Sequence, residues 1–323
     1  MRRRDIAAAL ALSATLGRAW GQNEPYPSRP VRMVAGAAAG SGTDVLARVL
    51  AERLGQLLGQ TVFVDNKPGS NGILANGDVA ASKPDGYTLL FCGFSTMVAN
   101  PWFYKKLPYR PLADFAPIAQ VGAGGNLLLV NPRLPVRNVQ ELVAWARAQK
   151  ATPLYATWGV GSSAHGAMEQ LTHSSGVKFE HVVYKTVPQL LQDLVGGQID
   201  IGWTDPMSPL PLIEQGSVRV LAVASTARAP RLPDVPTLLE QQIPMDLDGW
   251  YGLFVRHGTP DTITMRLHEL VAQISTQAGF VARLHALNVN VFPPGTPAQF
   301  TALIQHETQR WGELARRMGV EPQ

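Results

Sequence analysis

The chain has 323 residues, of which 46% are hydrophobic and 16% are charged, with a formal net charge of +4. This composition excludes a disordered chain, and the length exceeds what one ordinary core needs, so two α/β lobes are expected. The single cysteine, Cys92, excludes an intramolecular disulfide. Its position at the end of an apolar strand predicts a core residue rather than a nucleophile.

The first residues have the pattern of an export signal. Arg2 to Arg4 form a basic start, an apolar run follows to Leu16, and Ala19 and Gly21 are small residues before a cleavage point. The apolar run is too short to span a bilayer, so we expect a signal peptide at residues 1–21 that is removed. Without its four arginines and one aspartate the net charge falls to +1, and no nucleic-acid partner is expected. Sec and twin-arginine export both stay open.

Strands and helices are expected to alternate through the first half. Residues 31–35, 61–64 and 87–91 are predicted strands. Between the first two, leucines and valines from Val45 to Leu58 recur at helical spacing, and Gly59 ends that helix. This alternation predicts a mostly parallel sheet with helices on both faces.

The same alternation restarts after Asn126. Strands are expected at 127–130, 154–157, 181–184, 199–203 and 218–223, with helices at 139–149, 164–173 and from Pro188 to Gly196. An apolar strand follows at 250–255, and Pro260 and Pro297 each open a further helix. If this last segment returns to the first lobe, the chain crosses between lobes near 124–127 and 247–251.

Two loops of small residues carry the chemistry that the sequence offers. One joins a strand to a helix at 36–44, and the other does so at 155–165. Small side chains let a ligand approach the backbone, and a helix start supplies free N–H donors and a positive dipole end. Each loop alone is equally well explained as an ordinary turn with a helix cap. One in each half favours a two-jawed clamp for an anion.

Signatures of enzymes and nucleotide sites are poor. No lysine follows the glycines as in a Walker loop, and Val45 stands where a dinucleotide-binding loop needs its third glycine. The histidines lack zinc-site spacing, so no metal and no cofactor are expected. We therefore expect no enzyme. An exported α/β hydrolase that uses Ser162 or Ser163 is the alternative, and a scaffold or adhesin is a third class.

Several motifs, in this order along the chain, resemble the Bug family of periplasmic receptors, the substrate-binding components of tripartite tricarboxylate transporters. They are 31–34 with 40–48, 64–69, 83–90, 161–165, 183–185, 194–200, 232–237 and 250–254. The resemblance implies a periplasmic binding protein type II-like Venus flytrap whose lobes are joined by hinge strands. It implies lobe 1 at 29–125 plus 249–323 and lobe 2 at 126–248. It also implies a monomer in the periplasm that serves a membrane transporter, with a sensor as the other possible partner.

The family grips a small carboxylate ligand in the cleft, which here would be a di- or tricarboxylate, an acidic amino acid, or an aromatic or apolar acid. Position by position, the resemblance implies ligand contacts at Ala38, Ala39, Gly40, Ser41, Gly42, Thr43, Asp44, Asn71, Gly72, Ser95, Thr96, Gly161, Ser162, Ser163, His165, Tyr184, Lys185 and Asp205. Trp158, which this chain adds, is a further candidate. For Asp44 a helix-capping role is the alternative, for Lys185 a solvated loop position, and for His165 a surface or supporting position.

Some positions depart from the family pattern. Val160 replaces an asparagine, and Thr204-Asp205 replaces an Asp-Asn pair. Trp158 and Trp203 would add apolar surface to the half of the clamp that the second lobe supplies. We therefore expect a ligand with an apolar or aromatic portion beside its carboxylate.

Overall fold

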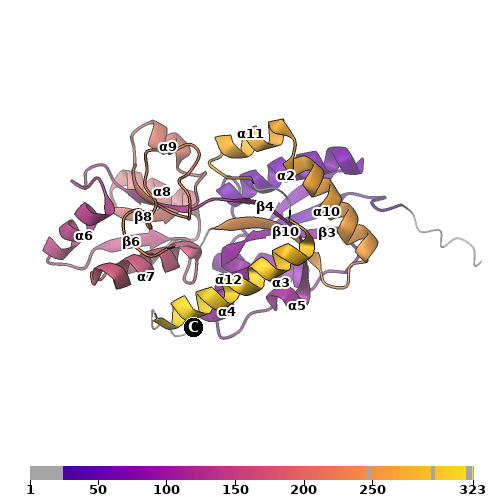
Figure 1. Cartoon of the computed structure of the whole chain (residues 1–323), viewed down its shortest axis with the longest axis horizontal. Helices are drawn as coiled ribbons and strands as arrows, with labels where there is room; N and C mark the ends of the chain where they lie inside the picture. Colours follow the sequence, from indigo (N-terminus) through magenta and orange to yellow (C-terminus); the bar gives the residue numbers. More distant parts are fainter. Residues whose placement is uncertain (1–24, 246–248, 292–294, 318–321, 323) are drawn as a thin grey trace, which may run out of the picture.

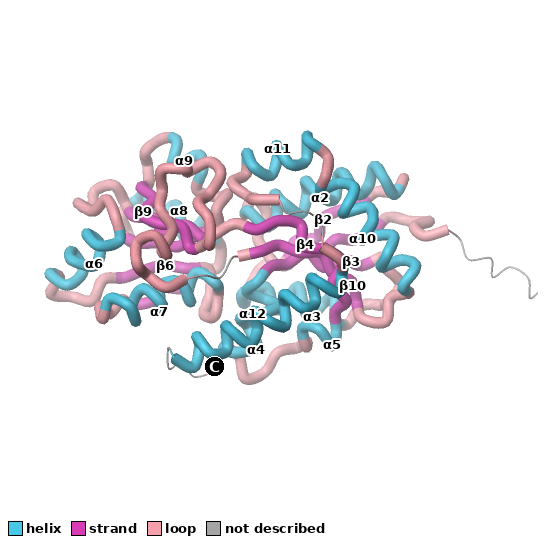
Figure 2. The backbone as a smooth tube through the Cα atoms, viewed as in Figure 1, coloured by secondary structure: helices cyan, strands magenta, loops and turns pink. Residues whose placement is uncertain are grey.

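The computed structural model describes residues 25–245, 249–291, 295–317 and 322. The predicted signal peptide lies outside these residues. Within them no helix is both long and apolar enough to cross a membrane. The chain forms two α/β lobes, each built around its own five-stranded sheet, with the strands at the centre and the helices outside (Figures 1 and 2).

The first sheet has the strand order β2-β1-β3-β10-β4. Its members are β1 (Val31–Ala35), β2 (Val62–Asn66), β3 (Thr88–Gly93), β4 (Phe115–Ala123) and β10 (Trp250–Arg256). β1 is parallel to β2 and β3, whereas β10 is antiparallel to β3 and β4. The last strand in sequence is thus inserted between β3 and β4, so the C-terminal segment belongs to the first sheet.

The second sheet has the order β7-β6-β8-β5-β9. Its members are β5 (Asn126–Val130), β6 (Leu154–Thr157), β7 (Glu180–Val183), β8 (Ile201–Thr204) and β9 (Arg219–Ala224). β6 is parallel to β7 and β8, and β5 is antiparallel to β8 and β9. Both sheets are therefore mixed. The expected two-lobe α/β fold is confirmed. Most strands of each sheet run in one direction, as expected, and a single strand is reversed in each, β10 in the first sheet and β5 in the second.

Helices cover both faces of each sheet. Around the first sheet lie α2 (Gly42–Leu58), α3 (Ile73–Ala80), α4 (Asn100–Phe103), α5 (Pro111–Asp114), α10 (Asp261–Ser275), α11 (Ala278–Ala286) and α12 (Pro297–Arg317). Around the second lie α6 (Val139–Ala148), α7 (Ser163–Ser175), α8 (Val187–Gly196) and α9 (Leu210–Glu214). Two short turns, η1 (Ser70–Gly72) and the π-helical η2 (Ser95–Ala99), complete the first lobe.

The connections between the sheets run side by side. The N–H of Gly124, directly after β4, donates to the carbonyl of Gly249, directly before β10, at 2.8 Å. A Cβ on Gly249 would lie 2.8 Å from the carbonyl oxygen of Gly124, so glycine permits this close approach. The two crossings therefore form one paired connection at the base of the cleft.

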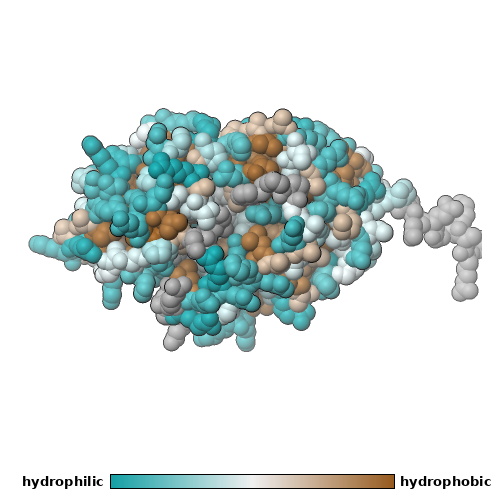
Figure 3. All heavy atoms as spheres, viewed as in Figure 1, coloured by the Kyte–Doolittle hydropathy of each residue, from teal (hydrophilic) through white to brown (hydrophobic). Residues whose placement is uncertain are grey.

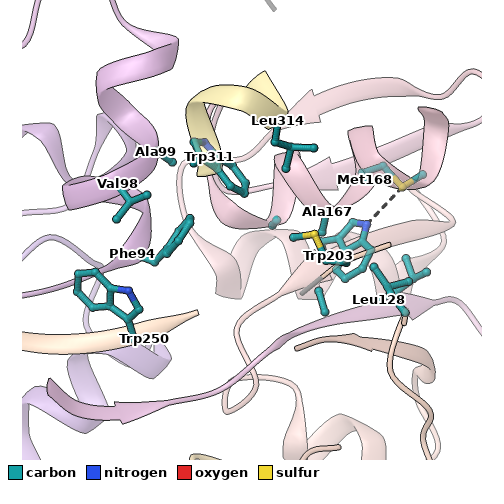
Figure 4. Packing of buried hydrophobic residues seen from close by; sticks show 14 of the residues in the cluster. Phe94, Val98, Ala99, Leu128, Ala167, Met168, Trp203, Trp250, Trp311 and Leu314 are labelled. Atoms are coloured by element: carbon teal, nitrogen blue, oxygen red, sulfur yellow. Dashed lines mark hydrogen bonds between the residues drawn. The ribbon is translucent and has the colours of Figure 1, made fainter. Parts of the chain in front are cut away.

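The apolar core is continuous between the lobes. One cluster includes Phe94 and Trp311 from the first lobe and Ala167 and Met168 from the second (Figure 4). Trp311, on α12, is fully buried, with its ring 5.1 Å from that of Phe94. A Cβ on Gly166 of α7 would lie only 2.1 Å from the Trp311 ring. The structure therefore has its lobes packed together, with α12 bridging them.

The face of the molecule seen in Figure 3 is mostly hydrophilic. Hydrophilic residues dominate the view in Figure 3, and hydrophobic ones appear as small separate patches. Large apolar side chains that are exposed, such as Phe63 and Val183, belong to different sheets. Scattered apolar residues of this kind are ordinary on a folded protein.

Candidate functional site

A cleft of about 140 Å³ lies between the lobes. Cavities of this size hold a molecule about as large as benzene. It is lined by Gly36, Ala37, Ala38, Ser41, Thr43, Pro68, Gly69, Asn71, Gly72, Cys92, Gly93, Phe94, Ser95, Thr96, Gly124, Asn126, Trp158, Ser163, Lys185, Thr186, Val187, Asp205, Gly249, Trp250 and Tyr251. Both sheets and the paired connection contribute, so a bound molecule would contact both lobes.

The structure brings many of the predicted site residues to this cleft. Those that line it are Ala38, Ser41, Thr43, Asn71, Gly72, Ser95, Thr96, Trp158, Ser163, Lys185 and Asp205. Ala39, Gly40, Gly42, Asp44, Gly161, Ser162, His165 and Tyr184 are not among the lining residues. Contact of any of these residues with a ligand stays a prediction.

The first jaw is the loop that leads into α2. Ser41 is the N-cap of α2 and accepts from the N–H of Asp44 at 3.5 Å. The Asp44 carboxylate accepts from the N–H of Gly40 and from Asn66 Nδ2, each at 2.9 Å, and pairs with Arg48 at 2.9 Å. Burial acts to raise the pKa of Asp44, but the hydrogen bonds from Arg48, Gly40 and Asn66 outweigh it and lower that pKa. Asp44 therefore holds in place the loop that leads into α2.

The second jaw is the loop that leads into α7. Ser162 is fully buried and caps the helix by accepting from the N–H of His165 at 3.1 Å. The Ser163 hydroxyl instead lies at the cleft and accepts from Asn126 Nδ2 at 2.8 Å. The ring of His165 accepts from the N–H of Gly161 through Nδ1 at 3.1 Å. Both serine hydroxyls thus have partners other than the imidazole, which is not the arrangement of a serine nucleophile and its base.

Behind this jaw His165 belongs to a stack of rings. It stacks on His181 with ring centres 4.5 Å apart, and His181 stacks on Tyr155 at 4.8 Å. Burial lowers the pKa of His165 to about 3 and that of His181 to about 4. Thr157 Oγ1 lies 2.7 Å from Nε2 of His181. Both imidazoles are consequently neutral at neutral pH. His165 has the supporting position, although it is buried rather than on the surface.

The third helix start at the cleft is that of α8, preceded by Lys185. Among the described residues that line the cleft, Lys185 carries the cationic side chain. No carboxylate of a described residue lies within 4 Å of its amine. The neighbouring Tyr184 points elsewhere, because its hydroxyl donates to Asp193 at 2.7 Å. Burial and Asp193 raise the pKa of Tyr184 to about 12. Lys185 is thus the charge available to an anion here.

Asp205 is the acidic side chain among the described residues that line the cleft. It is 8% exposed and accepts from the N–H groups of Met207 and Ser208 at 3.0 and 2.9 Å and from the Ser208 hydroxyl at 2.6 Å. These three hydrogen bonds compensate its burial. A Cβ on Gly42 would lie 2.2 Å from Oδ1 of Asp205, so this carboxylate sits directly against the start of α2.

An apolar wall, which the sequence analysis did not assign to the site, completes the cleft. It consists of Cys92, Phe94, Trp250 and Tyr251 from the first lobe and Trp158 from the second. Burial raises the pKa of Cys92 to about 12 and raises that of Tyr251 well above its usual value. These residues lie at or next to strand ends, close to the connections between the lobes. That position is the sequence signal that could have predicted their place in the site.

Trp203 does not contribute to this wall. It is fully buried in the core and its Nε1 donates to the sulfur of Met168 at 3.3 Å. Val160 is also away from the cleft, and its carbonyl accepts from the Tyr104 hydroxyl at 3.0 Å. Of the two tryptophans expected to make the second jaw apolar, only Trp158 does so.

A two-lobed α/β fold with a cleft between the lobes is the architecture of the periplasmic binding protein class. Residues 46–320 match the model of the tripartite tricarboxylate transporter family receptor. The chain therefore belongs to this family of receptors, which confirms the expected relationship and the expectation of a binding protein rather than an enzyme.

Solved structures of relatives support this family assignment. A Rhodopseudomonas palustris protein with adipate is 30% identical with a TM-score of 0.88, and covers 92% of this chain and 100% of its own. The periplasmic binding protein BugD is 31% identical with a TM-score of 0.86 and the same coverage. MatC from Rhodopseudomonas palustris, with bound malate, is 31% identical with a TM-score of 0.84, and covers 90% of this chain and 100% of its own.

Proposed function

We propose that this protein is a periplasmic receptor that captures a small carboxylate-bearing molecule between its lobes and delivers it to a membrane transporter. The observation that carries the proposal is the cleft itself. Both lobes line it, two small-residue loops at helix starts face it, and Lys185 brings a positive charge. Helix starts and a lysine are the groups that bind a carboxylate in proteins.

Export and lobe division form part of this proposal. The basic and apolar pattern of residues 1–21 supports a leader that is removed, and the periplasmic location of a relative such as BugD agrees with it. Lobe 1 comprises 29–125 and 249–323, and lobe 2 comprises 126–248. This division is supported by the change of sheet between β4 and β5 and again between β9 and β10.

The ligand is a small acid with an apolar portion. Relatives bind adipate and malate, so four- to six-carbon acids are the first candidates. In this chain Lys185 is the cation for one carboxylate, and Cys92, Phe94, Trp158 and Trp250 offer apolar surface to the rest of the molecule. Asp205 would repel a second carboxylate close to it. An acid with one buried apolar end therefore fits better than a citrate-like polyacid.

Capture requires that the ligand stabilises the closed state. A ligand that contacts both lobes binds the closed form more tightly than the open one and so shifts the population toward it. The closed form then docks on the membrane subunits of a transporter, or on a sensor protein. The family assignment supports the transporter.

Native mass spectrometry of the protein purified from its own periplasm tests this function. We expect a small acid to travel with the protein, and expect Lys185→Met to lower affinity for that acid about tenfold or more, as loss of a charged hydrogen bond does. Lys83→Met, at an exposed lysine that does not line the cleft, is the matched control. Unchanged affinity in the Lys185 variant, or a ligand without any carboxylate, would contradict the proposal.

A further inference from the structure

The first turn of each jaw helix is capped from the opposite lobe. In α2 the N–H of Gly42, the first helical residue, donates to Oγ of Ser208 at 3.1 Å. Ser208 follows β8 of the second sheet, and its hydroxyl donates to Oδ2 of Asp205 at 2.6 Å. Asp205 thereby fixes the hydroxyl with a lone pair directed at the start of α2.

The same arrangement occurs in reverse at α7. The N–H of Ser163, the first helical residue there, donates to Oγ of Ser95 at 3.1 Å. Ser95 begins η2, two residues after the end of β3 of the first sheet. Asn126, at the first residue of β5, donates to the Ser163 hydroxyl and holds it at this junction. Each lobe therefore supplies a serine hydroxyl to the equivalent N–H of the other lobe's helix.

These contacts differ from the ordinary caps of the two helices. Ser41 and Ser162 already cap them from within their own loops, at the N–H groups of Asp44 and His165. The first N–H of a helix has no partner inside the helix, so a hydroxyl from outside satisfies it. Because that hydroxyl comes from the other lobe, these bonds are present only when the lobes are together. Separation exchanges them for water.

We propose that Ser208, held by Asp205, and Ser95 are positioning residues that stabilise the closed state through these reciprocal caps. Ser208 does not line the cleft, so its effect on binding acts through lobe closure and not through ligand contact. This proposal rests on the proposed function only where it predicts a change in ligand affinity. Its effect on the distance between the lobes is independent of which molecule is bound.

Gly42 allows a second, steric test of the same contact between the lobes. A Cβ there would lie 2.2 Å from Oδ1 of Asp205 and 2.6 Å from Cε of Met207, both in the second lobe. Gly42 is a regular helical residue without a positive φ, so alanine suits the separated first lobe. Gly42→Ala should consequently disfavour the closed state while leaving α2 intact.

Pulsed electron–electron resonance measures the junction directly. Spin labels at exposed Gln56 of lobe 1 and Gln192 of lobe 2 report the distribution of lobe distances, alone and with sodium malate or sodium adipate as probes. We expect Ser208→Ala and Gly42→Ala to reduce the short-distance population. For a probe acid that binds, Ser208→Ala should reduce affinity about two- to tenfold, and Gly42→Ala about fivefold or more.

Two controls keep the result specific. Ser208→Thr retains a hydroxyl and should restore closure, and Ser82→Ala removes a hydroxyl that bonds only within the first lobe, to the carbonyl of Val79. Equal short-distance populations in wild type and Ser208→Ala would overturn the proposal, as would a wild type that shows no closed population in any condition. Weakened binding with unchanged lobe distances would overturn it too. Altered distances without binding of any acid would instead overturn the proposed function alone.

Discussion

The buried histidine stack makes the stability of the protein depend on pH in a direction that can be worked out. The pKa values of His165 and His181 are lowered from 6.5 to about 3 and about 4 by burial. Below pH 6.5 the unfolded chain takes up protons at both imidazoles, and the folded protein does not. The free energy of unfolding therefore falls as the pH drops from 6.5, and levels off below the folded pKa values.

The size of the effect follows from these shifts. At pH 5 each histidine lies about 1.5 pH units below its unfolded pKa and above its folded one, which corresponds to about 2 kcal/mol per histidine and about 4 kcal/mol together. Glu169, whose carboxylate lies 3.6 Å from Nε2 of His165, has a pKa raised by burial and offsets part of this loss. We thus expect a loss of about 2 to 4 kcal/mol between pH 7.5 and pH 5.

Denaturant unfolding at the two pH values, compared between variants, provides the assay. His181→Phe keeps a ring between Tyr155 and His165 but removes one titrating group, so the loss should fall to about half. Thr157→Val is the matched control, because it removes the hydrogen bond to His181 and keeps the imidazole. A stability that stays constant from pH 7.5 to pH 5 would show that the two imidazoles are not held neutral by burial, as would an undiminished loss in His181→Phe.

Three further predictions concern the lobe contact, the second jaw and the thiol. Gly166→Ala places a Cβ 2.1 Å from the ring of Trp311 and should destabilise the closed state by about 1 to 3 kcal/mol. Calorimetry should then show weaker ligand binding, which Trp311→Leu should restore; unchanged affinity would contradict the contact. Ser163→Ala should weaken binding about two- to tenfold, whereas Ser162→Ala should mainly lower the unfolding free energy by about 1 kcal/mol, and the reverse pattern would be inconsistent with their positions. Cys92, with a pKa of about 12, should resist Ellman's reagent at pH 8 until the protein unfolds, and rapid labelling of the native protein would contradict its burial.

Local patterns were enough to predict most elements of the fold. The helical spacing of apolar residues from Val45 to Leu58, ended by Gly59, matches α2. Strand β4 was missed because Pro117 and Gly122 interrupt its pattern, and proline is tolerated there because β4 is an edge strand. The insertion of β10 between β3 and β4 depends on contacts between segments far apart in sequence, which no local pattern encodes.

The candidate site was predictable only in part. Small residues at helix starts marked the two jaws, because helix geometry alone exposes their N–H groups. Trp250 and Cys92 were assigned to strands, and the sequence does not reveal that their strand ends face a cleft between the lobes. Ser208 was not predicted because its partner, Gly42, is 166 residues away in the chain.

Titration calorimetry with small acids and their methyl esters shows whether the protein captures a carboxylate between its two lobes. The panel comprises malate, adipate, citrate and aromatic acids of similar size. We predict saturable binding of one ligand per chain for at least one acid with an apolar portion, and loss of that binding when its carboxylate is esterified. Equal affinity for acid and ester, or no saturable binding of any acid in the panel, would contradict carboxylate capture.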